Sequence, residues 1–175
     1  MILLGERLPF ETFTEKEKRT MRSNVAKLVI GLAITAVGMF GADSSVGTWK
    51  LNVAKSKTTS SNPLISQTNI REATADGGVK VTRTEQATKG APTNSSFAYK
   101  YDGKENPATG APFDIISVKR IDANTTSFDV RKTGGKYDVT GQNVVSKDGK
   151  TMTQTSKGTD ADGKSVVATY IFDKQ

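Results

Sequence analysis

Beyond residue 46, apolar and polar residues alternate along the chain with a period of two, interrupted at short intervals by Gly, Asn or Asp. This alternation is typical of half-buried β-strands. Residues 54–64 are a predicted polar loop, and no later window has a convincing helical period. Nine strands are predicted, over residues 47–53, 65–74, 78–87, 95–102, 113–122, 125–132, 136–146, 150–158 and 164–173.

The connections between these runs are short and rich in turn residues. Asp-Gly pairs favour tight hairpins because glycine accepts a positive φ. Short connections join strands in antiparallel order, since parallel pairing requires long crossovers, and closing such a meander removes its exposed edges. The sequence therefore predicts an all-β fold, an antiparallel up-and-down β-barrel of eight to nine strands. The predicted turns are Asp76-Gly77-Gly78, Asp102-Gly103-Lys104, Asp122-Ala123-Asn124, Gly134-Gly135, Asp148-Gly149-Lys150 and Asp162-Gly163-Lys164.

The N-terminal part of the chain has a different pattern. Residues 1–20 mix charges with isolated apolar residues, which predicts a non-native or disordered extension ahead of a start at Met21. Residues 21–42 have a short basic head and then an apolar run over residues 28–40, the layout of a signal-peptide helix. That run is shorter than the roughly 20 residues of a spanning helix, so membrane attachment is expected only if the leader stays uncleaved. Residues 43–175 are then an exported domain, periplasmic or extracellular.

Composition restricts the chemistry of this domain. The chain has no cysteine and no histidine. Disulfides, thiolate zinc sites, thiol nucleophiles and the commonest general base are thereby excluded, and a non-catalytic protein without a cofactor is predicted. Residues 160–163 resemble a fragment of a calcium loop, but the other ligands of such a loop are missing, and turn chemistry explains them.

The net charge is +7, and residues 43–175 carry 25 − 6 = 19 basic against 18 − 4 = 14 acidic residues. Basic residues are scattered over turns and form no contiguous stripe with interleaved aromatics, which argues against nucleic acid as a partner. An anionic envelope polymer or lipid head group suits this modest excess better.

The stretch Gly47-Thr48-Trp49-Lys50-Leu51 resembles the Gly-x-Trp strand that opens the calycins, the superfamily of lipocalins and intracellular fatty-acid-binding proteins. This resemblance implies that Gly47 and Trp49 close one end of a barrel. The chain also resembles a family of small exported bacterial proteins that are lipocalin-like and carry no assigned activity. The resemblance lies in the opening strand and in three further stretches, residues 118–125, 145–151 and 170–175.

The chain also departs from these families. Fatty-acid-binding proteins hold the ligand carboxylate with a late Thr-Arg-x-Tyr, whereas this chain has Thr169-Tyr170-Ile171-Phe172. They carry two lid helices after the first strand, which residues 54–64 cannot supply. Lipocalins set a late arginine against the tryptophan, but no arginine follows Arg131, and Lys174 lacks the planar group that stacks on a ring.

Alternation assigns one face of each strand to the interior, and core packing is the ordinary explanation for its apolar residues. The predicted interior set is Trp49, Leu51, Val53, Val79, Val81, Phe97, Tyr99, Tyr101, Ile116, Val118, Phe128, Val130, Tyr137, Val139, Tyr170 and Phe172.

Some of these faces continue into polar positions, which makes them candidate ligand contacts. Arg83 and Glu85 follow Val81, and Gln154 follows Met152, so polar groups project into the barrel unless the strand bulges and leaves them solvated. Four tyrosines either offer hydroxyls at a barrel mouth or simply fill the barrel. The candidates are Arg83, Glu85, Tyr99, Tyr101, Arg120, Tyr137, Gln154 and Tyr170, with Arg83 or Arg120 orienting the polar end of a ligand.

Two hypotheses of function remain open at this point. The first is an exported barrel that binds a small hydrophobic or amphiphilic molecule. The second is an envelope interaction or inhibitor module with a filled barrel, whose polar loops at residues 54–64 and 88–94 bind a partner. An interior cavity of roughly 300 Å³ or more favours the first, and a filled core favours the second.

Overall fold

The structure, a computed structural model, describes residues 43–175. The predicted extension over residues 1–20 and the predicted signal peptide over residues 21–42 lie outside the described residues and stay predictions. Among residues 43–175, no helix has the length and apolar character needed to cross a membrane.

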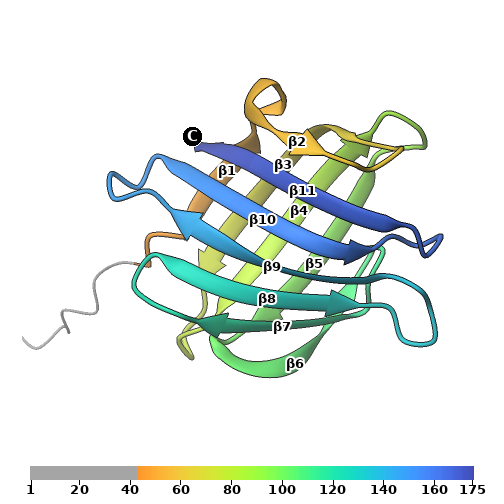
Figure 1. The fold of residues 1–175 in the computed structure, drawn as a ribbon. Helices are drawn as coiled ribbons and strands as arrows, with labels where there is room; N and C mark the ends of the chain where they lie inside the picture. Colours follow the sequence, from red (N-terminus) through yellow and green to blue (C-terminus); the bar gives the residue numbers. More distant parts are fainter. Residues whose placement is uncertain (1–42) are drawn as a thin grey trace, which may run out of the picture. The chain divides into compact units, whose positions relative to one another are not determined.

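The described residues form one antiparallel sheet that closes on itself (Figure 1). The sheet runs in the order β1-β3-β4-β5-β6-β7-β8-β9-β10-β11, and β1 pairs with β11 to complete the ring. The short strand β2 is added beside β11, and a single 3₁₀ turn, η1 (Val53–Lys55), precedes it. The strands are β1 (Gly47–Leu51), β2 (Lys57–Thr58), β3 (Leu64–Ala73), β4 (Val79–Ala87), β5 (Thr93–Tyr99), β6 (Asp102–Thr109), β7 (Ile115–Arg120), β8 (Thr125–Arg131), β9 (Asp138–Val145), β10 (Thr151–Thr159) and β11 (Ser165–Lys174).

This architecture confirms the predicted all-β class and the closed antiparallel meander. The predicted count of eight to nine strands is wrong, because the sheet has eleven strands. All nine predicted runs overlap observed strands, and the two missed ones are β2 and β6. No two-helix lid follows β1 in the described chain, but the polar loop predicted over residues 54–64 is interrupted by η1 and β2.

Strand β6 occupies part of the chain where the sequence predicts a turn and a loop. Its residues, Asp-Gly-Lys-Glu-Asn-Pro-Ala-Thr, contain no apolar alternation, and most of them are exposed. It pairs with β7, but with β5 only at Ser96↔Thr109 and Phe97↔Ala108. Closure of the ring, rather than burial of its side chains, therefore places β6 in the sheet, and a hydrophobic pattern cannot reveal such a strand.

The turns follow the predicted chemistry at most positions. Gly149 and Gly163 adopt φ values of 71° and 82° in their Asp-Gly turns, which glycine alone accepts without strain. The Oδ1 atom of Asp160 accepts hydrogen bonds from the backbone N–H groups of Asp162 and Lys164 at 3.0 and 2.9 Å. This carboxylate therefore stabilises the turn. Residues 43–175 contain no group of three acidic, histidine or cysteine side chains that could hold a metal ion.

The interior divides into two apolar clusters. The larger lies on β4, β5, β7, β8, β9 and the loop between β6 and β7, and the smaller gathers around Trp49. Gly141 serves the larger cluster, because a Cβ at this position would lie 2.6 Å from the Phe128 ring. One predicted interior residue is wrong: Val53 lies in η1 rather than in β1 and is 47% exposed. The smaller cluster consists of Trp49, Leu51, Val145, Met152 and Phe172, with Leu64 and Tyr170 against it.

Strand β3 differs from its neighbours because its inner face is polar. Gln67, Asn69 and Arg71 are buried, whereas Ile65 and Ile70 are exposed on the outer face. From Ser66 to Ala73, β3 pairs with β4 without interruption, and this register turns Gln67, Asn69 and Arg71 inwards. The irregularity between Leu64 and Ser66 lies before these residues. This polar inner face, continued by Arg83 and Glu85 on β4, is the structural basis of the candidate site.

Candidate functional site

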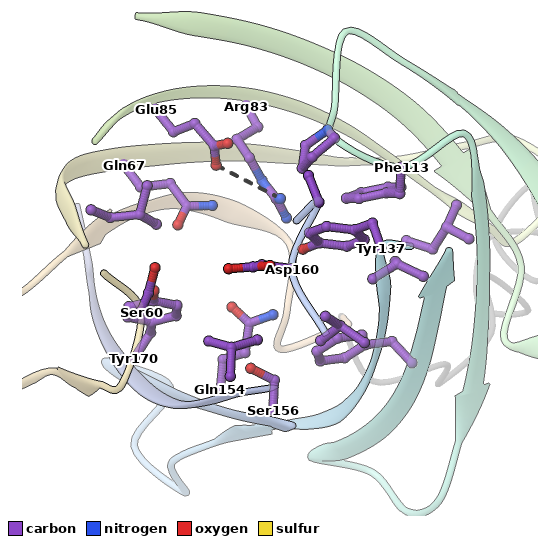
Figure 2. Close-up of a pocket in the computed structure, with 18 of the residues that line it drawn as sticks. Ser60, Gln67, Arg83, Glu85, Phe113, Tyr137, Gln154, Ser156, Asp160 and Tyr170 are labelled. Atoms are coloured by element: carbon purple, nitrogen blue, oxygen red, sulfur yellow. Dashed lines mark ion pairs between the residues drawn. The ribbon is translucent and has the colours of Figure 1, made fainter. Parts of the chain in front are cut away.

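A cavity of about 380 Å³ lies inside the barrel. This volume is at the low end of the roughly 300–1,000 Å³ typical of small-molecule sites. Its mouth lies among the loops that follow β2, β6 and β10, and Figure 2 shows side chains from several walls pointing into it. Labelled lining residues are Ser60, Gln67, Arg83, Glu85, Phe113, Tyr137, Gln154, Ser156, Asp160 and Tyr170.

One wall of the cavity, on β3 and β4, is polar and charged. Strand register places Asn69 opposite Arg83 and Gln67 opposite Glu85, so these side chains share the inner face. The Nε–H of Arg83 donates to the Oδ1 of Asn69 at 2.9 Å, and the Nε2 of Gln67 donates to the same oxygen at 3.2 Å. The carboxylate of Glu85 lies 3.9 Å from Nη1 of Arg83, a loose ion pair marked by the dashed line in Figure 2.

The part of the cavity next to β4 is largely aromatic. The rings of Phe97 and Phe113 meet edge to face with centroids 5.7 Å apart, and Phe113 is 6.1 Å from Tyr137. The guanidinium of Arg83 lies 5.2 Å from the centre of the Phe97 ring, within the range of a cation–π contact. The charged wall and the apolar wall therefore meet at Arg83.

Burial shapes the titration of the cavity side chains. Burial lowers the pKa of Arg83, and the negative charge of Glu85 opposes this effect. A guanidinium nevertheless stays charged under physiological conditions. Burial also raises the pKa of the Tyr137 and Tyr170 phenols, which therefore remain neutral hydrogen-bonding groups. The cavity therefore combines charged side chains on β3 and β4, the carboxylates of Asp160 and Asp162 in the loop after β10, and neutral phenols.

Two buried polar atoms of the cavity residues have no hydrogen-bond partner among residues 43–175. They are Nε of Arg71 and Oδ1 of Asn143, in side chains that are 7% and 8% exposed as residues. A buried polar atom without a partner is costly, and the great majority of such atoms are satisfied in folded proteins. Both residues line the cavity, so a bound molecule can reach them.

The loops at the mouth are tied to each other. Asn62 and Lys89 exchange two hydrogen bonds, from the Asn62 amide to the Lys89 carbonyl at 3.2 Å and from the Lys89 N–H to the Asn62 Oδ1 at 2.8 Å. The backbone N–H of Thr88 also donates to the Pro63 carbonyl at 2.9 Å. The two loops predicted to bind a partner thus meet beside the opening, and residues 60–62 of the first one line it.

The other end of the barrel is closed by Trp49 and the segment before β1. Trp49 is fully buried, and its Nε1–H donates to the Ser45 carbonyl at 2.8 Å. Lys174 crosses this end, with Nζ 5.1 Å from the centre of the indole ring. A Cβ at Gly47 would lie 2.7 Å from Cε of Lys174, so glycine leaves the space through which the lysine reaches the tryptophan.

Asp43 joins the two predicted ligand contacts that lie at this closed end. Its Oδ2 accepts from the Tyr101 hydroxyl at 2.6 Å and from Nη2 of Arg120 at 2.8 Å, and its Oδ1 accepts from the Ser45 N–H at 2.9 Å. The guanidinium of Arg120 also lies 3.8 Å from the centre of the Tyr101 ring. Burial alone would raise the pKa of Asp43, but these hydrogen bonds and the Arg120 charge lower it below its ordinary value.

Comparisons with known proteins give likenesses of fold only. No protein-family model matches the chain, and no curated protein does. The solved structure of the fluorescent protein UnaG is similar with a TM-score of 0.48 and 13% identity, over 75% of this chain and 97% of that one. A structure described as EF1p2_mFAP2b bound to DFHBI is similar with a TM-score of 0.46 and 11% identity, over 77% of this chain and 96% of that one.

The structure brings most of the predicted site residues together. Six line the cavity, namely Arg83, Glu85, Tyr99, Tyr137, Gln154 and Tyr170. Tyr101 and Arg120 do not line it and instead bind Asp43 at the closed end. Gly47 and Trp49 also lie at that end.

The sequence analysis missed Gln67, Arg71 and Asn143. The first two belong to a polar alternation, Gln67-x-Asn69-x-Arg71, that points towards an interior only if Ile70 is accepted as an exposed residue. The signal was present in the pattern, but the register of β3 against β4 was needed to choose between the two faces.

Proposed function

We propose that this protein binds a small amphiphilic molecule inside the barrel and carries out no chemistry on it. The observation that supports this proposal is the 380 Å³ cavity, which has a mouth, an aromatic wall and a charged wall. An apolar body packs against Phe97 and Phe113, while the polar end faces β3 and β4. Pockets of this kind, apolar with a few polar groups that orient the ligand, are typical of small-molecule sites.

The proposal excludes catalysis because of the residue types that the chain and its cavity contain. The chain has neither histidine nor cysteine, so a base would have to be a lysine or a carboxylate. In the cavity, Glu85 is 3.9 Å from Arg83, and Asp160 accepts backbone hydrogen bonds in its turn. Neither of these contacts joins a base to a nucleophile, and binding alone accounts for the arrangement.

The interaction-module hypothesis requires a filled barrel, and the cavity argues against that requirement. The mouth loops, joined through Asn62 and Lys89, then act as the rim of the ligand site rather than as a separate docking surface.

Export is also part of the proposal, and it is supported only by the signal-peptide pattern of residues 21–42. N-terminal sequencing of the protein recovered outside the cytoplasm tests it, and a sequence that still begins at or before Met21 contradicts it.

Cavity binding is tested by filling the space. Ser156 lines the cavity on β10, and its neighbour Thr155 is exposed on the outer face of the same strand. The neutral fluorescent probe N-phenyl-1-naphthylamine should bind the wild-type protein. Ser156→Phe should weaken that binding by about tenfold or more, because a lost contact worth 1.4 kcal/mol is a factor of ten.

Thr155→Phe is the matched control, since it adds the same ring outside the barrel. It should leave the affinity for the probe unchanged. Equal loss in both variants, or no probe binding by the wild type under conditions where its circular dichroism shows a folded sheet, contradicts the proposal.

A further inference from the structure

Arg71 and Arg83 place two positive charges on the same inner wall. Arg71 lies opposite Val81 and Arg83 opposite Asn69, so the two arginines are diagonal neighbours across β3 and β4. Long side chains reach each other from such positions. The charge of Arg71 lowers the pKa of Arg83, as expected for two like charges in proximity.

Protein groups only partly offset this charge. Glu85 supplies one carboxylate, at 3.9 Å from Arg83, which is a distance longer than a charge-assisted hydrogen bond. Asn69 accepts from Nε of Arg83, while Nε of Arg71 has no partner among residues 43–175. On β3 and β4, the two arginines and Glu85 leave an excess of one positive charge. The acidic residues Asp160 and Asp162 also line the cavity, in the loop after β10, where the Asp160 carboxylate accepts backbone N–H groups. A buried unpaired charge is expensive, so a function that uses it is the natural explanation.

The cavity wall on β9 and β10 carries polar side chains that constrain another part of the ligand. Asn143 on β9 lies beside Gln154 in register, and both line the cavity. The Oδ1 of Asn143 is an acceptor without a donor among residues 43–175. A ligand that satisfies both walls therefore carries an acceptor with negative charge at one end and an N–H or O–H donor elsewhere.

We infer that the ligand is a singly charged organic oxyanion, whose carboxylate or sulfonate lies against Arg71 and Arg83 and whose N–H or O–H donates to Asn143. This inference rests on the proposed function and specifies the chemical class of its ligand. One negative charge balances the excess on β3 and β4. The anion site is on β3 and β4, unlike the last-strand arginine of the fatty-acid-binding proteins that the chain resembles in its first strand.

Two probes that differ by one sulfonate group test this inference. 8-Anilino-1-naphthalenesulfonate is N-phenyl-1-naphthylamine with an added sulfonate, and both carry an N–H. Arg71→Met keeps an unbranched apolar stem in place of the arginine stem and removes its charge. It should weaken binding of the sulfonate by about tenfold to a hundredfold, the range expected for a hydrogen bond to a charged group, and change binding of the neutral probe by less than about threefold.

A second cavity variant tests the direction of the charge effect on sulfonate affinity, and a surface arginine variant is the matched control. Glu85→Gln removes the competing carboxylate and should strengthen sulfonate binding without affecting the neutral probe. Arg131→Met removes the same charge from the outer face of β8, where Arg131 is exposed and paired with Glu105 at 2.9 Å, and should change neither affinity appreciably. The urea midpoint of Arg71→Met should equal or exceed that of the wild type, because an unsatisfied buried group is removed.

The outcomes separate the two proposals. If the wild type binds neither probe, the proposed function fails. If it binds the neutral probe but Arg71→Met and Arg131→Met affect sulfonate binding equally, the inference about the anion is overturned and the binding function stands. A lower urea midpoint for Arg71→Met with unchanged sulfonate affinity would assign the arginine to the fold instead.

Discussion

Replacing Trp49 with alanine is expected to lower the free energy of unfolding by about 3 to 5 kcal/mol. The indole is fully buried among Leu51, Val145, Met152 and Phe172, and a cavity remains when it is removed. The variant also leaves the Ser45 carbonyl without its indole donor. Urea denaturation followed by far-UV circular dichroism measures the change, because the chain has a single tryptophan and the variant loses that fluorescence.

Trp49→Phe is the companion variant if the alanine form does not fold. It keeps most of the ring but loses the hydrogen bond to Ser45, so a smaller loss of roughly 1 to 2 kcal/mol is expected. A change below about 1 kcal/mol for Trp49→Ala would show that this residue does not hold the closed end together.

Asp43→Ala is expected to lower the free energy of unfolding at neutral pH by about 1 to 3 kcal/mol, because it removes an anionic acceptor from two side chains at once. Tyr101 and Arg120 donate to this carboxylate at 2.6 and 2.8 Å. Arg120 keeps 34% of its side chain exposed, so water replaces part of what is lost. The effect tests whether the segment before β1 is a structural part of the barrel.

The Asp43 effect should depend on pH in a defined direction. The pKa of Asp43 in the folded protein lies below its ordinary value of 3.8, so its ionised form is stabilised by folding. That stabilisation is fully present above the ordinary pKa and is lost as the pH falls through the lower, folded-state pKa. The difference between wild type and Asp43→Ala, measured by urea melts, should therefore be constant near neutral pH and shrink below about pH 4.

Asp76→Ala provides a contrast at an exposed site. A hydrogen bond from Thr74 and the neighbouring Lys100 lower the pKa of Asp76 to about 2, yet its side chain is 60% exposed. Solvent screens such pairs, so the loss of stability should be smaller than for Asp43→Ala. An Asp43 effect no larger than the Asp76 effect, or one independent of pH, would mean that Asp43 does not fasten the closed end.

Much of the barrel and part of the site follow from local patterns. Alternation located nine strands, and Asp-Gly turns such as Asp148-Gly149 appear where expected, because both depend on a few neighbouring residues. The same alternation predicts that Arg83 and Glu85 continue the inward face of Val81, and the structure places both in the cavity wall. Trp49 was singled out by its first-strand motif and is fully buried.

Other features depend on contacts between distant parts of the chain. Tyr101 and Arg120 have the residue types of ligand contacts, but Asp43 lies 58 and 77 residues before them and binds both. No local sequence pattern predicts the hydrogen bonds from Tyr101 and Arg120 to Asp43. Strand β6 is likewise held by pairing with β7 and part of β5, although its own residues are mostly exposed.

The sequence by itself determined the class of fold, the antiparallel order and the position of most strands, because side-chain alternation and turn chemistry are local properties. Only the tertiary structure decided the strand number, the closure of β1 on β11 and the inward face of β3. The physical reason is that a one-residue change of register exchanges the two faces of a strand. The uninterrupted register of β3 against β4 from Ser66 to Ala73 places Gln67 and Arg71 inside and Ile70 outside, and this gives the cavity its charged wall.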